Sequence, residues 1–357
     1  MNEKLPFKGF DSLSELGEFG LIDQVAALFG SAGYAGETGI GDDCAVLPYG
    51  EDRSMLVTTD MLIEDRHFRC DWITPEDLGY KSLAVNLSDI SAMGGKPLYA
   101  FLSIGLPEGL AVSWIEEFFR GTHELTQKHH VQLMGGDTTK SSGPVVINYT
   151  ILGVMPTDSI LWRSGAKAGD KIAVLGDPGE SGAGLKLLLE QKPPFSRSEQ
   201  KLIDAHHRPR LFVEEAQFLA ESGAVNAMID LSDGMESDAR HIAQKSDVTL
   251  EMDFASIPIT HTLQRVCDFR SWDPLELAVA SGEDYGLLFT LDGAKVDHLQ
   301  QEFHQKFGYS FRTIGEVAEG PAELKWMKNG EEVDVGKKGF DHFRSEKSTL
   351  RQGFDEQ

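Results

Sequence analysis

Hydrophobic and polar positions follow two different periods along the first 155 residues of the chain. Short apolar runs predict strands over 55–60, 99–106, 131–134 and 145–154. Between them, apolar residues that recur every three or four positions predict helices over 16–29, 74–93 and 112–129. A glycine-flanked turn over 39–44 leads into one further short strand. This alternation of strands and helices is typical of an α/β or α+β fold.

A second alternation begins at Lys171, after Pro156-Thr157-Asp158 interrupts the first. Strands are predicted over 171–176, 227–230, 248–252, 287–291 and 311–315, and helices over 182–190, 210–222 and 237–245. The polar, proline-containing segment 192–200 is predicted to be a loop. Because 357 residues exceed the size of one typical core, we expect two domains, 1–155 and 156–357.

The helix predicted over 74–93 carries the clearest boundary signals. Thr74 is a good N-cap, Pro75 suits the first helical position, and two acidic residues follow in the first turn. Gly94 and Gly95 are typical of a helix C-terminus. These signals place the polar group Asn86-Leu87-Ser88-Asp89 in the second half of this helix.

The chain is strongly acidic, with 57 Asp and Glu against 33 Lys and Arg and a formal net charge of −24. Such a charge argues against nucleic acid and anionic membranes as partners. The three cysteines, Cys44, Cys70 and Cys267, form no CxxC pair, which fits a reducing cytoplasm. The N-terminus has no apolar signal-peptide core and no run of about 18 apolar residues occurs, so we expect a cytoplasmic protein.

Oxygen-bearing side chains gather where the predicted elements end. The apolar run 55–57 leads directly into Thr58, Thr59 and Asp60, which we expect to end a strand. Other aspartates are expected at element ends beside glycine or hydroxyl residues: Asp42, Asp43, Asp89, Asp137, Asp230 and Asp233. Each of these alone is typical of a turn or a helix cap. The set as a whole favours a shared site.

So many converging carboxylates are more than a general acid–base pair requires. Like charges at close range raise one another's pKa unless something neutralises them. Oxygen ligands suit Mg²⁺, which also pairs with substrate phosphates, and the sequence has no His/Cys cluster at zinc spacing. The pattern therefore predicts several Mg²⁺ ions, which would allow so acidic a chain to hold polyphosphate.

Phosphate-binding motifs of the usual kinds are absent from the sequence, since no P-loop or dinucleotide-binding pattern occurs. The glycine-rich segment 176–184 either holds an anion on its backbone amides or forms a flexible surface loop. Arg163 is a better phosphate ligand because it lies between the two predicted halves. His67, seven residues after Asp60, either contacts a substrate phosphate or has a structural role.

Eight motifs resemble those of the thiamine-monophosphate kinases, and the likeness runs in order from Leu16 to about Phe343. They are GIGDD at 39–43, TTD at 58–60 with Glu64 and His67-Phe68, NLSD at 86–89, GGDTT at 135–139, RSGA at 163–166, HRP at 207–209, DLSDG at 230–234 and GEDY at 282–285. This family belongs to the aminoimidazole-ribonucleotide-synthetase-like superfamily of ATP-using enzymes. The resemblance implies two α/β domains, with the N-terminal sheets of two subunits pairing into a barrel across a homodimer.

The resemblance also implies direct transfer of the ATP γ-phosphoryl group to thiamine monophosphate, giving thiamine diphosphate in the last step of its biosynthesis. Residue by residue, it implies eight metal ligands: Asp43, Thr58, Thr59, Asp60, Asp89, Asp137, Asp230 and Asp233. The positions implied to contact ATP are Phe119, Gly136, Asp137, Arg163 and Ser232. The implied substrate contacts are His67, Glu283 and Phe340, and the residues implied to carry catalysis are Arg163, Asp60 and Asp89.

The sequence departs from the family pattern at Asp65-Arg66, Ser281 and Met235-Glu236, none of which is a proposed ligand. Sister enzymes remain alternatives: selenophosphate synthetase, aminoimidazole ribonucleotide synthetase and the hydrogenase-maturation dehydratase. The first carries a reactive cysteine near its N-terminus and the last ends in a cysteine, whereas here the earliest cysteine is Cys44 and the sequence ends in Gln357. A non-catalytic nucleotide- or cation-binding protein is the alternative from another class, and we expect such a protein to have lost ligands.

Overall fold

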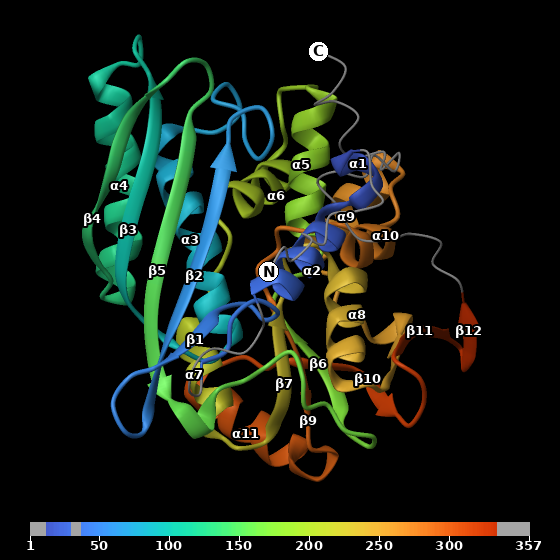
Figure 1. The fold of residues 1–357 in the computed structure, drawn as a ribbon. Coiled ribbons are helices and arrows are strands. Elements are labelled where there is room, and N and C mark those ends of the chain that lie inside the picture. The colour runs from blue at the N-terminus through green and yellow to red at the C-terminus, as the bar shows by residue number, and fades with distance from the viewer. Residues whose placement is uncertain (1–11, 30–36, 334–357) are drawn as a thin grey trace.

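The structure is a computed structural model and describes residues 12–29 and 37–333. These residues form two β-sheets with helices packed against each (Figure 1). The first sheet is built from residues 45–156 and the second from residues 171–333. Among the helices of these described ranges, none is both long enough and apolar enough to cross a membrane.

The first sheet contains the strands β1 (Ala45–Pro48), β2 (Arg53–Ile63), β3 (Lys96–Pro107), β4 (Gln132–Ser141) and β5 (Val146–Pro156). Their order in the sheet is β1-β2-β5-β3-β4, and only β3 and β4 run parallel to each other. Helices α3 (Pro75–Ala92) and α4 (Val112–His129) cover one face of this sheet, behind the strands in Figure 1. Two short helices, α1 (Leu13–Leu16) and α2 (Glu18–Phe29), precede it.

Two strands of this sheet are longer than the sequence pattern predicts. β2 does not end at Asp60 but continues to Ile63, because it pairs with β5 along its whole length. β4 likewise continues past Asp137 to Ser141 beside β3. The expectation that the aspartates lie at element ends is therefore wrong for Asp60 and Asp137. Asp89 lies in the last turn of α3, near the end of that helix, as expected.

The second sheet contains seven strands in the order β12-β11-β8-β10-β6-β9-β7. The strands are β6 (Lys171–Leu175), β7 (Val225–Asp230), β8 (Thr249–Asp253), β9 (Leu287–Leu291), β10 (Arg312–Ala318), β11 (Glu323–Lys328) and β12 (Glu331–Val333). The helices of this half are α5 (Glu180–Glu190), α6 (Arg197–His207), α7 (Val213–Glu221), α8 (Met235–Ser246), α9 (His261–Arg270), α10 (Pro274–Ala280) and α11 (Val296–Phe307). Buried side chains of α7 and α11 pack on one face of the sheet, and those of α8 and α10 pack on the other.

Helix α3 connects the two halves and begins as predicted. Thr74 accepts a hydrogen bond from the amide of Asp77 (3.1 Å), and Pro75 lies in the first turn. The helix is buried along most of its length, because it packs on the first sheet and α4 and also contacts α7 and β7 of the second half. It crosses α4 so closely that a Cβ on Gly121 would lie 1.8 Å from the carbonyl oxygen of Glu76. Only glycine fits at that crossing.

Helix α6 lies where a polar loop is predicted, so the prediction for 192–200 is wrong after residue 196. Ser196 and Glu199 form a capping box: the Ser196 hydroxyl accepts from the Glu199 amide (3.3 Å), and the Ser196 amide donates to the Glu199 carboxylate (2.7 Å). This Ser-x-x-Glu signal is present in the sequence, but the two prolines before it favour the prediction of a loop. Helices α9, α10 and α11 also lie in segments for which no helix is predicted.

Candidate active site

Three aspartates from distant parts of the chain meet between the two halves. Asp43 precedes β1, Asp89 lies on α3 and Asp230 is the last residue of β7. One carboxylate oxygen of each lies within 4.8 Å of the others. The Asp43 side chain and the whole of Asp230 are only 1% exposed. The structure thus brings together three of the residues predicted as metal ligands, which could jointly hold a cation.

Hydroxyl and amide groups fix these carboxylates in place. The Thr58 hydroxyl donates to the Asp89 carboxylate, and the Ser88 hydroxyl donates to Asp230 Oδ2 (2.6 Å). Beside them, the side-chain oxygen of Asn86 accepts from the backbone amide of Asp60 (2.9 Å). Because Asn86, Ser88 and Asp89 all belong to α3, this one helix arranges ligands from both halves. Asn86 and Ser88 are not among the predicted site residues, although they stand in the NLSD motif.

Burial and mutual repulsion raise the pKa of several carboxyls in this cluster. Burial, followed by the charge of Asp43, raises the pKa of Asp230 to about 8. The same two causes raise the pKa of Asp60 to about 6. Burial, together with Asp60 and Asp230, raises the pKa of Asp89 well above its ordinary value. The ionised cluster is therefore unfavourable by itself and requires protons or cations to neutralise it.

Arg163 is the cation that faces the cluster. Its guanidinium donates to Asp43 Oδ1 from two nitrogens, at 2.5 and 3.2 Å, and its backbone amide donates to Asp42 Oδ2 (3.1 Å). Burial acts to lower the pKa of Arg163, but the two aspartates outweigh it and raise that pKa. The second carboxylate oxygen of Asp43 is buried and has no hydrogen-bond partner within the described ranges. That oxygen is an open ligand position.

Thr58 and Thr59, both predicted as metal ligands, face opposite sides of the first sheet. Whereas the Thr58 hydroxyl contacts the cluster, the Thr59 hydroxyl donates to the carbonyl of Tyr149 and accepts from the Asn148 amide, each at 3.0 Å. Successive side chains of a strand alternate between its two faces, which explains the difference. The structure therefore does not place the Thr59 hydroxyl in the cluster of its own chain.

Gly136, Asp137 and Phe119 lie apart from the cluster. β4, which carries Gly136 and Asp137, is the edge strand of the first sheet, and β3 and β5 separate it from β2. Three inter-strand spacings place Asp137 about 14 Å from Asp60. Phe119 is 38% exposed on α4. The structure therefore does not bring these three residues to the aspartate cluster of their own chain.

Ser232 and Asp233 lie in the loop between β7 and α8, and both are partly exposed. The Ser232 carbonyl accepts from the amide of Glu283 (2.8 Å), which joins the two predicted motifs. Asp238, in the first turn of α8, is buried nearby. Burial and Asp233 raise its pKa well above the ordinary value, and its Oδ2 has no hydrogen-bond partner in the part of the chain described. Sequence reasoning missed Asp238.

The substrate residues predicted at His67 and Glu283 lie around a second group of buried side chains. His67 Nδ1 accepts from the Ile63 amide (3.0 Å), and the ring lines a small pocket together with Lys81 and His206. Lys81 also donates to the Glu283 carboxylate (3.1 Å). The structure thus links His67 and Glu283 through Lys81, a residue that the sequence motifs did not single out. The third predicted substrate residue, Phe340, lies outside the described residues.

The glycine-rich segment 176–184 is neither an open anion cradle nor a surface loop. The amides of Gly179 and Ser181 donate to the carboxylate of Asp284, at 2.7 and 3.1 Å. Burial raises the pKa of Asp284 to about 8 in spite of these bonds. An acidic side chain of the chain itself therefore occupies the anion position at the start of α5.

The residues that depart from the family pattern leave the cluster undisturbed. Asp65 and Arg66 are exposed. The Ser281 hydroxyl donates to the Leu277 carbonyl and packs on Gly182, where a Cβ would lie 2.0 Å from that hydroxyl. The serine is thus accommodated by a glycine of α5.

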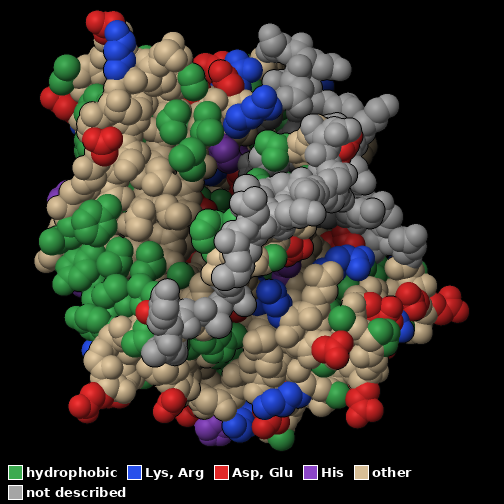
Figure 2. Space-filling view, in the orientation of Figure 1, with side chains coloured by type: hydrophobic (Ala, Val, Ile, Leu, Met, Phe, Trp, Pro, Cys, Tyr) green, Lys and Arg blue, Asp and Glu red, His purple; other side chains and the backbone are tan. Residues whose placement is uncertain are grey.

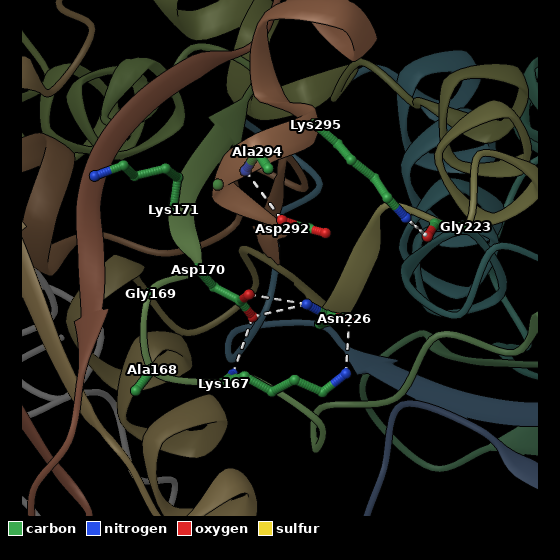
Figure 3. Close-up of a pocket in the computed structure, with 11 residues that line it drawn as sticks. Lys167, Ala168, Gly169, Asp170, Lys171, Gly223, Asn226, Asp292, Ala294 and Lys295 are labelled. Carbon is green, nitrogen blue, oxygen red and sulfur yellow. Dashed lines mark hydrogen bonds between the residues drawn. The ribbon is translucent and has the colours of Figure 1, made fainter.

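A cavity of about 720 Å³ lies elsewhere in the described residues. Figure 3 shows its lining, which includes Lys167, Asp170, Asn226 and Lys295. It adjoins the start of β6 and β7, whereas Asp230 ends β7, so cavity and cluster lie at opposite ends of the second sheet. Two of its charged groups are already hydrogen-bonded to neutral partners: Asp170 accepts two bonds from the Asn226 amide, and Lys295 donates to the Gly223 carbonyl (2.9 Å).

Two family models match this arrangement of two halves around one site. The N-terminal domain of AIR synthase related proteins matches residues 41–155, and the C-terminal domain matches residues 167–326. These matches define the class: an AIR synthase related protein with a two-domain α/β fold of mixed sheets. A solved structure of the hydrogenase maturation protein HypE in complex with ATP shares this fold at 20% identity, with a TM-score of 0.64.

Comparison with named relatives shows which family of AIR synthase related proteins the chain belongs to. The thiamine-monophosphate kinase of Escherichia coli (strain K12) is 38% identical over 328 residues, which cover 92% of this chain and 98% of the relative. That of Aquifex aeolicus (strain VF5) is 36% identical over 331 residues, covering 93% and 99%. The solved structure "AaThiL complexed with AMPPCP and TMP" has a TM-score of 0.82 at 35% identity and covers 93% of this chain and 99% of that one. The chain belongs to the thiamine-monophosphate kinase family.

Proposed function

We propose that this protein transfers the γ-phosphoryl group of ATP directly to thiamine monophosphate, giving thiamine diphosphate in the last step of its biosynthesis. The observation that carries the proposal is the buried cluster of Asp43, Asp89 and Asp230 beside Arg163, in a member of this family. A relative with 35% identity binds both AMPPCP and TMP. We propose that residues 1–155 form the domain that binds ATP and Mg²⁺ and makes the dimer contact. Residues 156–357 then form the domain that completes the active site. We propose the cytoplasm as the location of the protein.

We propose that the aspartate cluster holds Mg²⁺. Its donors are oxygens, its carboxyls have raised pKa values, and Asp43 offers a buried oxygen without a partner in the described part of the chain. These features fit a hard cation. Asp43, Asp89 and Asp230 would hold one ion. We propose Asp60, Asp233 and the Thr58 hydroxyl as ligands of further ions. Bound Mg²⁺ supplies neutralisation of the ATP phosphates beside an acidic protein.

The protein's own part in the transfer is orientation and charge. Arg163 is pre-positioned by Asp43 and Asp42, so its guanidinium can contact ATP phosphates without reorganising. No catalytic base is needed, because the acceptor is a phosphate monoester whose oxygens are already largely ionised at neutral pH, with a second pKa of about 6. His67 then orients the acceptor phosphate, and positioning accounts for most of the rate enhancement.

We further propose that two chains pair through the open face of the first sheet, forming a barrel across a homodimer. Figure 2 shows hydrophobic side chains gathered over this sheet. Large apolar residues there are 38–55% exposed: Tyr99, Phe101, Met61 and Met134. A monomer rarely leaves such a face uncovered, whereas a two-fold interface would bury it in both copies.

The same dimer would explain where Asp137 and Gly136 act. They lie about 14 Å from Asp60 within one chain, too far to share a cation whose ligands stand about 2 Å from it. We propose that β4 of each chain brings these residues, with Phe119 of the neighbouring α4, to the nucleotide site of the partner chain.

One direct assay tests the proposed function. The purified protein is incubated with ATP, Mg²⁺ and thiamine monophosphate, and the products are separated by chromatography. We expect thiamine diphosphate and ADP in equal amounts, with no product when Mg²⁺ is chelated. ATP binding without any turnover would instead favour a nucleotide-binding protein that has lost its activity.

A further inference from the structure

Lys81 is a buried cation at the boundary between the two halves. It stands on α3 and is 1% exposed. Its ammonium group lies 3.1 Å from Glu283 Oε2 and 3.3 Å from His206 Nε2, both of which belong to the second half of the chain. A buried lysine is costly unless its charge is paired, so this contact has to be made for the native structure to be stable.

The hydrogen-bond geometry defines the state of His206. An ammonium group can only donate, so Nε2 of His206 accepts from Lys81. Nδ1 therefore carries the proton, and it lies 3.3 Å from the Glu283 carboxylate and 3.0 Å from the Ser181 hydroxyl. His206 is thus a neutral bridge, and Lys81 supplies the positive charge that faces Glu283.

The backbone around Glu283 is held in an unusual conformation. Glu283 has φ +63° and Tyr285 has φ +50°, a region that residues with side chains rarely adopt. The Glu283 amide donates to the Ser232 carbonyl (2.8 Å), and a Cβ on Gly282 would lie 2.2 Å from that same oxygen. The second half thus fixes the backbone of Glu283, while the first half, through Lys81, directs its carboxylate.

We propose that Lys81 is a positioning residue for the acceptor: it holds the Glu283 carboxylate ionised and aimed where it can contact the cationic thiazolium of thiamine monophosphate. This inference rests on the proposed function, in which Glu283 is an acceptor contact. Lys81 lies about two turns before Ser88 and Asp89 on the same helix. α3 therefore arranges both the cation cluster and the acceptor contact, which fixes their separation.

Arg208 provides a matched control, because it is another cation that joins the two halves near Lys81. It follows α6 in the second half, and its guanidinium donates to Asp77 (3.0 Å) and Glu124 (2.5 Å) in the first half. It also lies 4.1 Å from the ring of Tyr80, the neighbour of Lys81. A purely structural role at this boundary would give Lys81 and Arg208 variants the same phenotype.

The test compares the full-length Lys81→Met and Arg208→Met variants in steady-state assays, with melting temperature measured in parallel. We expect Lys81→Met to raise KM for thiamine monophosphate at least tenfold and to leave KM for ATP within twofold of wild type. Arg208→Met should leave both KM values within twofold of wild type, even if its melting temperature falls as far as that of Lys81→Met. An equal rise of both KM values in Lys81→Met, or no rise in either, overturns the proposal.

A double variant keeps the test valid if Lys81→Met folds poorly, because Lys81→Met/Glu283→Gln leaves no unpaired buried carboxylate. If Lys81 acts through Glu283, the double variant should show the same KM for thiamine monophosphate as Glu283→Gln alone. If the double variant instead raises KM for thiamine monophosphate by the product of the two single-variant effects, the positioning role is overturned. A wild-type KM in Glu283→Gln overturns Glu283 as an acceptor contact. Failure of the wild-type protein to form thiamine diphosphate would instead overturn the proposed function itself.

Discussion

At the scale of single residues, the charge of Asp60 affects both cation binding and the stability of the metal-free site. Its backbone amide donates to the Asn86 side chain (2.9 Å), which fixes the position of Asp60 on β2. Burial and Asp43 raise its pKa to about 6, which shows that the ionised form is repelled by its surroundings. Asp60 therefore contributes to cation binding at a cost to the stability of the empty site.

We predict that Asp60→Asn lowers kcat at least about 100-fold without loss of structure, since the amide keeps the shape and removes only the charge. The melting temperature should stay unchanged or rise, because one repelling carboxylate is removed. Asp158→Asn, at an exposed position, is the control and should behave as wild type. Near-normal activity of Asp60→Asn at limiting Mg²⁺ would show that Asp60 is not a metal ligand.

The raised pKa values also predict how stability depends on pH. Asp60 and Asp230 have pKa values of about 6 and 8 in the folded protein, above the ordinary 3.8, so the folded state binds more protons than the unfolded state between about pH 4 and 8. The metal-free protein should therefore lose stability as pH rises through this window. Mg²⁺ replaces the missing protons, so it should raise the melting temperature more at pH 8.5 than at pH 6.

Scanning fluorimetry at both pH values, with chelator or with about 10 mM Mg²⁺, measures the melting-temperature shift that Mg²⁺ causes at each pH. Asp230→Asn is the control variant, because it lacks the carboxyl with the pKa of about 8 and should lose most of the extra shift at pH 8.5. Other titrating groups, such as Asp284, change the melting temperature equally with chelator and with Mg²⁺ at a given pH, so they do not alter the shift that Mg²⁺ causes. An equal Mg²⁺ effect at both pH values would contradict the assignment of these carboxyls to a cation site.

At the level of elements, the crossing of α3 and α4 determines the geometry of the site. α3 carries Asp89 and the side chains of Asn86 and Ser88, which hold Asp60 and Asp230. α4 packs against α3 at a close distance through Gly121. We predict that Gly121→Ala lowers the free energy of unfolding by about 1–3 kcal/mol, because the helices must separate to admit one methyl group. Gly143→Ala, which has no atom within 4 Å of its Cβ, should change it by less than about 0.5 kcal/mol.

Urea denaturation of both variants provides the free energies. Activity should fall with stability in Gly121→Ala, since a shift of α3 moves Asp89 relative to Asp43 and Asp230. Equal stability of the two variants would mean that the crossing adapts without strain.

The elements that were predicted well are those whose ends are encoded locally. α3 lies within one residue of its predicted range at each end, because Thr74 and the glycines after the helix define its limits. β2 extends beyond Asp60 because its length depends on pairing with β5, about 90 residues away in sequence, and no local pattern shows this. The capping box of α6 was a local signal, but the preceding prolines favoured a loop.

At the scale of the whole molecule, the meeting of Asp43, Asp89 and Asp230 agrees with the sequence motifs. The motifs could not show that Asp137 lies across the sheet from Asp60, because the order of strands is set by long-range pairing rather than by chain order. Lys81 was missed for a related reason: in the sequence it is one lysine on a helix, and only the packing of the second half against α3 makes it a buried partner of Glu283 and His206.

The separation of Asp137 from Asp60 makes the proposed dimer open to a decisive test. If light scattering gives the mass of one 39.3 kDa chain at micromolar concentration, the dimer is excluded. If it gives two, Asp60→Asn and Asp137→Asn chains with different tags can be co-expressed and the heterodimers purified. Each homodimer should be inactive, because every site lacks one ligand.

In the heterodimer, one site combines the intact Asp60 of one chain with the intact Asp137 of the other, while the second site has lost both. We therefore predict about half of the wild-type activity per dimer, as two-fold symmetry requires for a site shared between chains. The control pairs Asp60→Asn with Asp89→Asn, whose carboxyls belong to the cluster of a single chain, so no intact site can form and no activity should return. An inactive Asp60→Asn/Asp137→Asn heterodimer would mean that Asp137 acts within its own chain, and β4 would then have to move relative to β2 when nucleotide binds.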